Sequence, residues 1–281
     1  MTVVQTVGVV GAGTMGVGIA YVFAAAGSEV AIVEPNLERA RAARTVLADQ
    51  AAGARARGKL DPAMHEALEG RLRFVAAISD LPDSLDLAIE AVPERAGLKR
   101  VVLAEVEHRR PALLATNTSG IAIGELAGAL CHPEVFLGLH FFNPVWSMPL
   151  VEIVRGRHTN DATLAAAQEV VTQIGKSRIV VDDAPGFATS RLGVVIALEA
   201  MRMLQAGIAS AEDIDRAMEL GYRHPMGPLK LTDLVGLDVR LDIATNLARA
   251  YGPRFDPPQI LLEKVAAGEL GRKTGRGFYT W

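Results

Sequence analysis

The stretch from residue 3 to residue 34 says most about how this chain folds. An apolar run, Val3 to Val10, meets the sequence GAGTMG at 11–16, a helix-like segment continues to Gly27, and a second apolar run ends at Glu34. This order predicts a strand, a tight glycine turn, a helix and a second strand that ends on a carboxylate, which is the pattern of a dinucleotide-binding unit.

The residues of this turn have the spacing that a dinucleotide requires. Gly11 permits the tight turn, Gly13 lets the backbone approach a pyrophosphate, and Gly16 lets the helix pack closely on the sheet. The helix that begins at Thr14 and Met15 would present unpaired N–H groups and the positive end of its dipole to the phosphates. An ordinary strand-to-helix turn is the competing interpretation.

Glu34 indicates which dinucleotide is bound. It stands where a carboxylate would accept hydrogen bonds from the ribose hydroxyls of the adenosine. The same carboxylate would repel a 2′-phosphate, so the predicted cofactor is NAD rather than NADP. The alternative is a solvated acid at the end of a strand.

Composition argues against several classes of protein. The 281 residues carry 29 Lys and Arg against 32 Asp and Glu, with no long run of one sign, so neither nucleic acid nor an anionic membrane is an expected partner. Cys131 is the only cysteine, which rules out an internal disulfide and a cysteine-rich metal site, and fits a reducing cytoplasm. Because Gly, Pro or charge breaks each apolar run, and the apolar start leads directly into the glycine turn, we expect neither a membrane span nor a signal peptide.

Chain length and sequence texture predict two domains. Strand-like and helix-like segments alternate up to residue 183, which is typical of a Rossmann-like, mainly parallel sheet with helices on both faces. Residues 184–281 instead carry helical patterns at 187–206, 211–220, 228–250 and 257–267, and are expected to form an all-helical domain. Apolar surface left on that second domain predicts a homodimer, against a self-contained bundle packed on the first domain.

Among the six histidines, His140 has the surroundings expected of a catalytic base. It ends an apolar run, 135–139, in the region where open parallel sheets place their ligands. Glu152 lies twelve residues later within another apolar run, where an unpaired charge would be costly. An imidazole would satisfy this carboxylate, which would in turn fix the histidine tautomer and stabilise the imidazolium. The alternative is a core histidine and an unrelated, exposed Glu152 on an edge strand.

The segment 116–120, Thr-Asn-Thr-Ser-Gly, follows another short apolar run. Its amide and hydroxyl groups, among them Asn117 and Ser119, could hydrogen-bond a substrate oxygen or a nicotinamide amide at the end of a strand. The same residue types are also common in turns and N-caps, so both interpretations stay open.

Together these segments resemble the 3-hydroxyacyl-CoA dehydrogenase family, and within it the short-chain 3-hydroxybutyryl-CoA dehydrogenases. The resemblance implies reversible hydride transfer between NAD and C3 of a (3S)-3-hydroxyacyl-CoA thioester. It covers nearly the whole chain, and its most specific part is the HFFNP segment with the VEIV that follows it. The segments that carry it are GAGTMGVGIA, IEAVPE, TNTSG, LGLHFFNPVWSMPLVEIV, DDAPGFATSRL, HPMGPLKLTDLVGLDV and GRKTGRGFY.

The resemblance implies catalytic roles for four residues. His140 would be the general base, Glu152 its orienting partner, and Ser119 a hydrogen-bonding group for the 3-oxygen of the substrate. Ser190 departs from the family pattern, because this position usually holds an asparagine that keeps the substrate near the histidine. A serine hydroxyl is shorter and would act directly or through water.

The resemblance also implies binding residues. The expected contacts to NAD beside the glycine turn are Glu34, Glu94, Lys99, Asn117, Asn143 and Lys273. The expected contacts to the phosphates of coenzyme A are Arg55, Arg57 and Lys59, for each of which a solvated helix end is the alternative.

Two other functions remain open from the sequence. One is an NAD-dependent dehydrogenase of a small free hydroxy acid on the same fold, like the sugar-acid dehydrogenases related to lens crystallins. The pair Phe141-Phe142 favours the acyl-CoA substrate over that reaction. The other is a dinucleotide-binding protein without catalysis, which Ser190 would favour and the joint presence of His140, Glu152 and Ser119 argues against.

Overall fold

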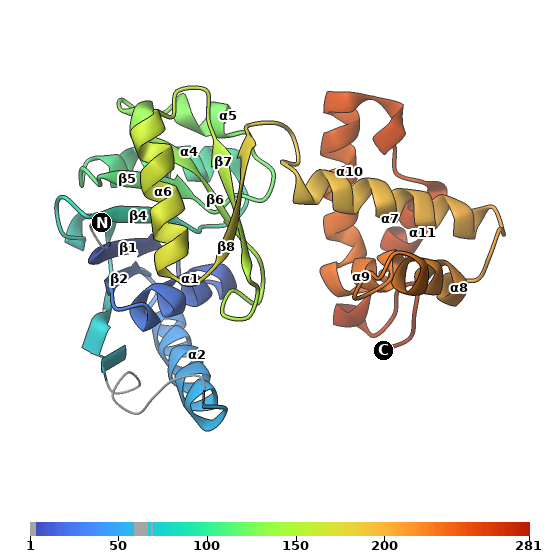
Figure 1. The fold of residues 1–281 in the computed structure, drawn as a ribbon, viewed down its shortest axis with the longest axis horizontal. Helices are drawn as coiled ribbons and strands as arrows, with labels where there is room; N and C mark the ends of the chain where they lie inside the picture. Colours follow the sequence, from blue (N-terminus) through green and yellow to red (C-terminus); the bar gives the residue numbers. More distant parts are fainter. Residues whose placement is uncertain (1–3, 59–66, 69) are drawn as a thin grey trace. The chain divides into compact units, whose positions relative to one another are not determined.

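The computed structural model describes residues 4–58, 67–68 and 70–281. The chain divides into two compact units, residues 1–183 and 184–281. The first contains a large sheet with helices around it, and the described part of the second is built mainly of helices (Figure 1). The predicted fold class, a Rossmann-like α/β unit followed by a helical one, is confirmed.

The first unit is built on one eight-stranded sheet with the strand order β3-β2-β1-β4-β5-β6-β7-β8. Neighbouring strands are parallel except for the antiparallel pair β6 and β7. The strands are β1 (Thr6–Val10), β2 (Glu29–Val33), β3 (Leu72–Val75), β4 (Leu87–Glu90), β5 (Leu113–Thr116), β6 (Phe136–Phe141), β7 (Leu150–Arg155) and β8 (Ser177–Asp182). The central strands are apolar and buried on both faces, as a parallel sheet covered by helices requires.

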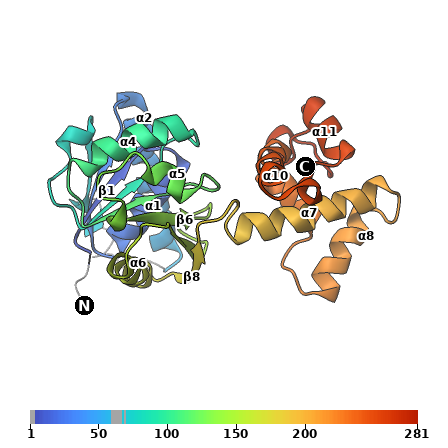
Figure 2. The same cartoon turned by 90° about the horizontal axis from the view of Figure 1, so that it is seen from above.

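Helices cover both faces of this sheet. Buried residues of α1, α2 and α6 share one apolar core with inward-facing residues of the strands. Figure 2 shows α6 on the opposite side of the sheet from α4 and α5. Among the described residues, the helices of this unit include α1 (Thr14–Ala25), α2 (Leu37–Ala56), α4 (Ala96–Glu107), α5 (Ile123–Ala127) and α6 (Asp161–Gln173).

The turn between β1 and α1 is as tight as its glycines predict. Gly11 has a φ of 105°, and a Cβ there would lie 2.9 Å from the carbonyl oxygen of Ala91. A Cβ on Gly16 would overlap the carbonyl oxygen of Gly11. Gly13, in contrast, faces open space, with no atom within 4 Å of the position of a Cβ. Two of the three glycines are therefore needed by the fold itself, and the third leaves room beside the backbone.

The second unit contains α7 (Thr189–Gln205), α8 (Ala211–Arg216), a π-helical turn (Ala217–Gly221), α9 (Pro228–Val235), α10 (Leu237–Tyr251) and α11 (Gln259–Ala266). The prediction of one continuous helix over 228–250 was wrong, because Gly236 takes a φ of 106° and separates α9 from α10. None of the helices in the described ranges is both long and apolar enough to cross a bilayer.

Two buried carboxylates fasten the end of the chain to these helices. Asp233 accepts hydrogen bonds from the backbone N–H groups of Phe278 and Tyr279 and from the indole N–H of Trp281. Asp215 accepts from the hydroxyl of Tyr279 at 2.7 Å. The last residues of the chain, 278–281, are thus hydrogen-bonded to the helices of the second unit and have a structural role there.

The substitution Gly16→Ala should destabilise the first unit, because the new methyl group would overlap the backbone carbonyl oxygen of Gly11, so the turn itself would have to shift. Overpacking of this kind typically costs about 1–3 kcal/mol. Thermal unfolding without cofactor should show a lower midpoint for Gly16→Ala than for the matched control Gly13→Ala, whose methyl group would face open space and change only the N-cap. Equal midpoints for the two variants would contradict the packing role assigned to Gly16.

Candidate active site

A cavity of about 920 Å³ opens at the carboxyl ends of β1, β2, β4, β5 and β6. It lies in the first unit and extends from the glycine turn to the end of β6. Ten of the residues predicted to form the site line it: Gly11, Gly13, Thr14, Met15, Glu34, Glu94, Asn117, Ser119, His140 and Asn143. One cavity therefore joins the expected cofactor residues to the expected catalytic histidine.

The glycine-turn end of this cavity fits a dinucleotide. Gly13 caps α1 through its backbone only, since no side chain caps this helix end. The first N–H groups of α1, beginning at Thr14, are thus suited to a pyrophosphate. Glu34 lines the same end and is 8 % exposed, and its Oε1 accepts a hydrogen bond from the N–H of Asn36 at 3.0 Å. This hydrogen bond orients the carboxylate that would meet the adenosine ribose.

His140 and Glu152 lie directly opposite each other on the antiparallel strands β6 and β7. The imidazole Nδ1 is 2.7 Å from Oε2 of Glu152. His140 is 7 % exposed and Glu152 is fully buried, because β8 pairs with the other edge of β7. The alternative interpretation, in which Glu152 is exposed and unrelated to His140, is therefore wrong.

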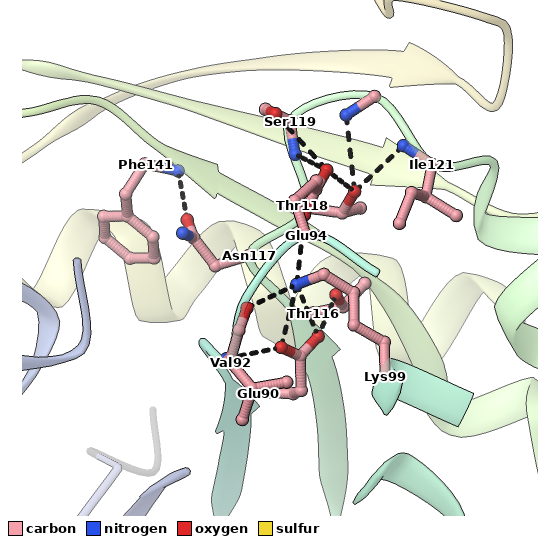
Figure 3. A network of polar contacts seen from close by, with 11 residues as sticks. Glu90, Val92, Glu94, Lys99, Thr116, Asn117, Thr118, Ser119, Ile121 and Phe141 are labelled. Atoms are coloured by element: carbon pink, nitrogen blue, oxygen red, sulfur yellow. Dashed lines mark hydrogen bonds and ion pairs between the residues drawn. The ribbon is translucent and has the colours of Figure 1, made fainter. Parts of the chain in front are cut away.

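Two neighbouring residues hold the end of β6 in place. The ring of Phe142 packs on the imidazole of His140, with centroids 4.4 Å apart. The side-chain oxygen of Asn117 accepts a hydrogen bond from the backbone N–H of Phe141 at 2.9 Å (Figure 3). Asn117 is therefore part of the wall that positions the histidine, as well as a lining residue.

Ser119 is held by Glu94. Oε1 of Glu94 accepts from the backbone N–H of Ser119 at 2.9 Å, from its hydroxyl at 3.3 Å, and from the hydroxyl of Thr118 at 2.5 Å. Burial alone would raise the pKa of Glu94, but the charge of Lys99 and these hydrogen bonds outweigh it and hold the pKa below its ordinary value. Glu94 therefore remains an acceptor, and it fixes the turn that carries Ser119.

A buried ion pair that was not predicted from the sequence lies next to this turn. Glu90, at the end of β4, is fully buried and binds Nζ of Lys99 at 2.8 and 3.0 Å (Figure 3). It also accepts from the hydroxyl of Thr116 at 2.6 Å and from the N–H of Val92 at 2.7 Å. The signal that singled out Glu152, an acid inside an apolar strand, was present at Glu90 as well.

Several predicted residues lie elsewhere. Lys99 is 1 % exposed and does not line the cavity, so any effect on NAD would pass through Glu94. Arg55 and Arg57 are exposed at the end of α2, away from the cavity wall, and Lys59 lies outside the described residues.

Two predicted residues belong to the second unit. Ser190 stands in the first turn of α7. Lys273 forms an ion pair with Asp238, with Nζ 2.5 Å from Oδ2. Their place relative to His140 stays a prediction.

The chain is similar to known proteins along its whole length. Residues 6–184 match the 3-hydroxyacyl-CoA dehydrogenase NAD binding domain, and residues 186–281 match the C-terminal domain of the same family. A 3-hydroxybutyryl-CoA dehydrogenase of Mycobacterium tuberculosis is 44% identical over 283 residues, which cover 99% of each chain.

Comparison with solved structures also finds similarity along the whole chain. M. tuberculosis FadB2 superposes with a TM-score of 0.94 at 43% identity, covering 100% of both chains. The (S)-3-hydroxybutyryl-CoA dehydrogenase PaaH1 of Ralstonia eutropha gives a TM-score of 0.95 at 38% identity, covering 99% of both chains. The chain therefore belongs to the 3-hydroxyacyl-CoA dehydrogenase family, and its first unit is the NAD-binding domain of that family.

Proposed function

We propose that this chain catalyses the reversible, NAD-dependent oxidation of a short-chain (3S)-3-hydroxyacyl-CoA, such as 3-hydroxybutyryl-CoA, to the 3-oxoacyl-CoA. The observation that carries the proposal is the imidazole of His140, which lines the same cavity as the glycine turn and is paired with the buried carboxylate of Glu152 behind it. The names of the full-length relatives support the substrate class.

In this proposal His140 moves the proton of the reaction. Nδ1 is engaged by Glu152, so Nε2 is the ring nitrogen that takes the proton from the 3-hydroxyl group during oxidation and returns it during reduction. The carboxylate of Glu152 holds the tautomer and stabilises the imidazolium. Ser119, held by Glu94, would hydrogen-bond the 3-oxygen. The bound nicotinamide supplies the hydride acceptor.

The proposal also assigns contacts to the coenzyme A part of the substrate and roles to two residues of the second unit. The exposed cations Arg55 and Arg57 are the proposed contacts for the phosphates of coenzyme A. Ser190 is proposed to hold the substrate in place of the usual asparagine, and Lys273 to approach NAD. The cytoplasm is the proposed location, since coenzyme A thioesters and a single unpaired cysteine both fit a reducing compartment.

The alternative substrate is a small free hydroxy acid. The aromatic pair Phe141-Phe142, of which Phe142 packs on the catalytic imidazole, favours the acyl-CoA. Reduction of acetoacetyl-CoA by NADH, followed at 340 nm beside free acetoacetate, separates the two. Turnover of the thioester alone supports the proposal, and turnover of the free acid alone overturns it.

The variant His140→Gln should lose most of its turnover, because glutamine keeps a polar group at this place but cannot exchange the proton. Positioned acid–base groups contribute about 10² to 10⁴ in rate, so kcat for acetoacetyl-CoA reduction should fall by that factor. The dissociation constant of NADH, measured by fluorescence titration, should be nearly unchanged. Loss of NADH affinity at unchanged kcat would contradict the role of His140.

Glu34 should set the choice of cofactor. The variant Glu34→Ala removes the charge that would repel a 2′-phosphate and leaves the cation of Arg39 in the same cavity. The ratio of kcat/KM for NADPH to that for NADH should rise about tenfold, the effect of roughly 1.4 kcal/mol of charge repulsion near a surface. The exposed Glu38, which lies on α2 and does not line the cavity, is the control: Glu38→Gln should leave the ratio unchanged. A wild-type enzyme that prefers NADPH would overturn this role.

The homodimer also stays a proposal, and the second unit supports it. Several large apolar side chains there are well exposed, among them Leu192, Ile208, Leu220 and Tyr222 at 61 to 76 %. A second copy would cover such surface with twofold symmetry. Sedimentation equilibrium at micromolar concentration should give twice the mass of one chain, and a monomer at that concentration would contradict the dimer.

A further inference from the structure

The ion pair of Glu90 and Lys99 is the most deeply buried charged pair near the cavity. Glu90 is fully buried and Lys99 is 1 % exposed, and neither side chain lines the cavity. Glu90 lies in register with Val10 of β1 and Thr116 of β5, at the centre of the sheet. Removing two charges from water is expensive, and a well-packed apolar pair often stabilises a fold as well or better. Stability alone therefore gives little reason for this pair.

Lys99 links two carboxylates. Its ammonium group binds both oxygens of Glu90, at 2.8 and 3.0 Å, and the carbonyl oxygen of Val92 at 3.2 Å. It also lies 3.2 Å from Oε2 of Glu94. Glu90 thus fixes the ammonium group of Lys99, and this ammonium group in turn fixes Oε2 of Glu94.

Glu94 uses its other oxygen for the turn that carries Ser119. Oε1 accepts from both the N–H and the hydroxyl of Ser119, and from the hydroxyl of Thr118. A continuous set of contacts therefore runs from Glu90 through Lys99 and Glu94 to Ser119 (Figure 3).

The geometry points to Glu90 as a positioning residue for catalysis: it holds Lys99, and through Lys99 and Glu94 it sets the place of Ser119 in the cavity wall. Lys99 belongs to this set of contacts and acts on the cofactor site through Glu94. The inference rests on the proposed function, in which Ser119 hydrogen-bonds the 3-oxygen of the substrate.

The main test is the variant Glu90→Gln, which keeps the shape of the side chain and removes its charge. Misplacement of a substrate-orienting group by about 1 Å can cost about 100-fold in rate, so kcat for acetoacetyl-CoA reduction should fall about 10- to 100-fold while the dissociation constant of NADH changes little. The milder variant Thr116→Val removes only the hydroxyl donor to Glu90 and should lower kcat severalfold.

The matched control lies at the other end of the same strand. Asp86, just before β4, accepts hydrogen bonds from the N–H groups of Gln5 and Thr6 and takes no part in the cavity. Asp86→Asn should lower the thermal midpoint without lowering kcat. If Glu90→Gln and Thr116→Val behave like Asp86→Asn, with stability reduced and kcat intact, the positioning role is overturned.

A pH profile gives a second test that a purely structural role would not move. Protonation of Glu94 weakens the hydrogen bonds that it accepts from Thr118 and Ser119, so the low-pH limb of the rate profile should report this carboxylate. Lys99→Met removes the cation that holds down the pKa of Glu94, so this limb should move to higher pH. Glu90→Gln keeps Lys99 and should not move the limb upward. An unmoved limb in Lys99→Met overturns the link from Lys99 to Glu94.

Failure of the inference can be told apart from failure of the proposed function. A wild-type enzyme that turns over no 3-oxoacyl-CoA with NADH contradicts the function. An active wild-type enzyme whose kcat is unaffected by Glu90→Gln contradicts only the inference.

Discussion

The antiparallel pairing of β6 with β7 is the constraint on which the active site depends. Parallel neighbours need a crossover of a dozen or more residues, whereas an antiparallel pair can be joined by a short connection. The reversal therefore lets two residues only twelve apart, His140 and Glu152, face each other across one ladder. Because β8 pairs with the far edge of β7, Glu152 is buried and the imidazole is its partner at 2.7 Å.

The parallel part of the sheet brings the other half of the site to the same place. β1 and β4 are neighbours although β2 and β3 separate them in sequence, so the chain changes direction across the sheet at this point. Open α/β sheets bind ligands in the crevice at such a switch point. The glycine turn after β1, the carboxylate of Glu94 after β4 and the hydroxyl of Ser119 after β5 consequently share one cavity with His140.

The parts of the molecule that could be predicted from the sequence are those that depend on residues close together in the chain. The glycine turn, the buried strands and the acid within the run 150–154 each show in a short window, and His140 and Glu152 could be paired because both need a partner. Gly236 shows where such reasoning fails: apolar spacing continues through it, and only the backbone conformation, with a φ of 106°, separates α9 from α10. Glu90 and Lys99 were missed as a pair because their contact depends on how the end of β4 meets α4. The resemblance predicts a contact between Lys99 and NAD, and only the fold shows that the Lys99 side chain is buried.

Glu152 fixes the imidazole of His140 in the tautomer with Nδ1 protonated and Nε2 free to act as the base. Nitrogen-15 NMR of histidine-labelled enzyme, recorded at a pH where the ring is neutral, reports the tautomer directly. The signal of His140 is identified as the one that is missing from the spectrum of His140→Gln. We expect a protonated Nδ1 and an unprotonated Nε2, with the Nδ1 proton shifted downfield by its hydrogen bond to the carboxylate. A neutral ring protonated at Nε2 would contradict this expectation, because that nitrogen could not then accept the proton of the substrate hydroxyl.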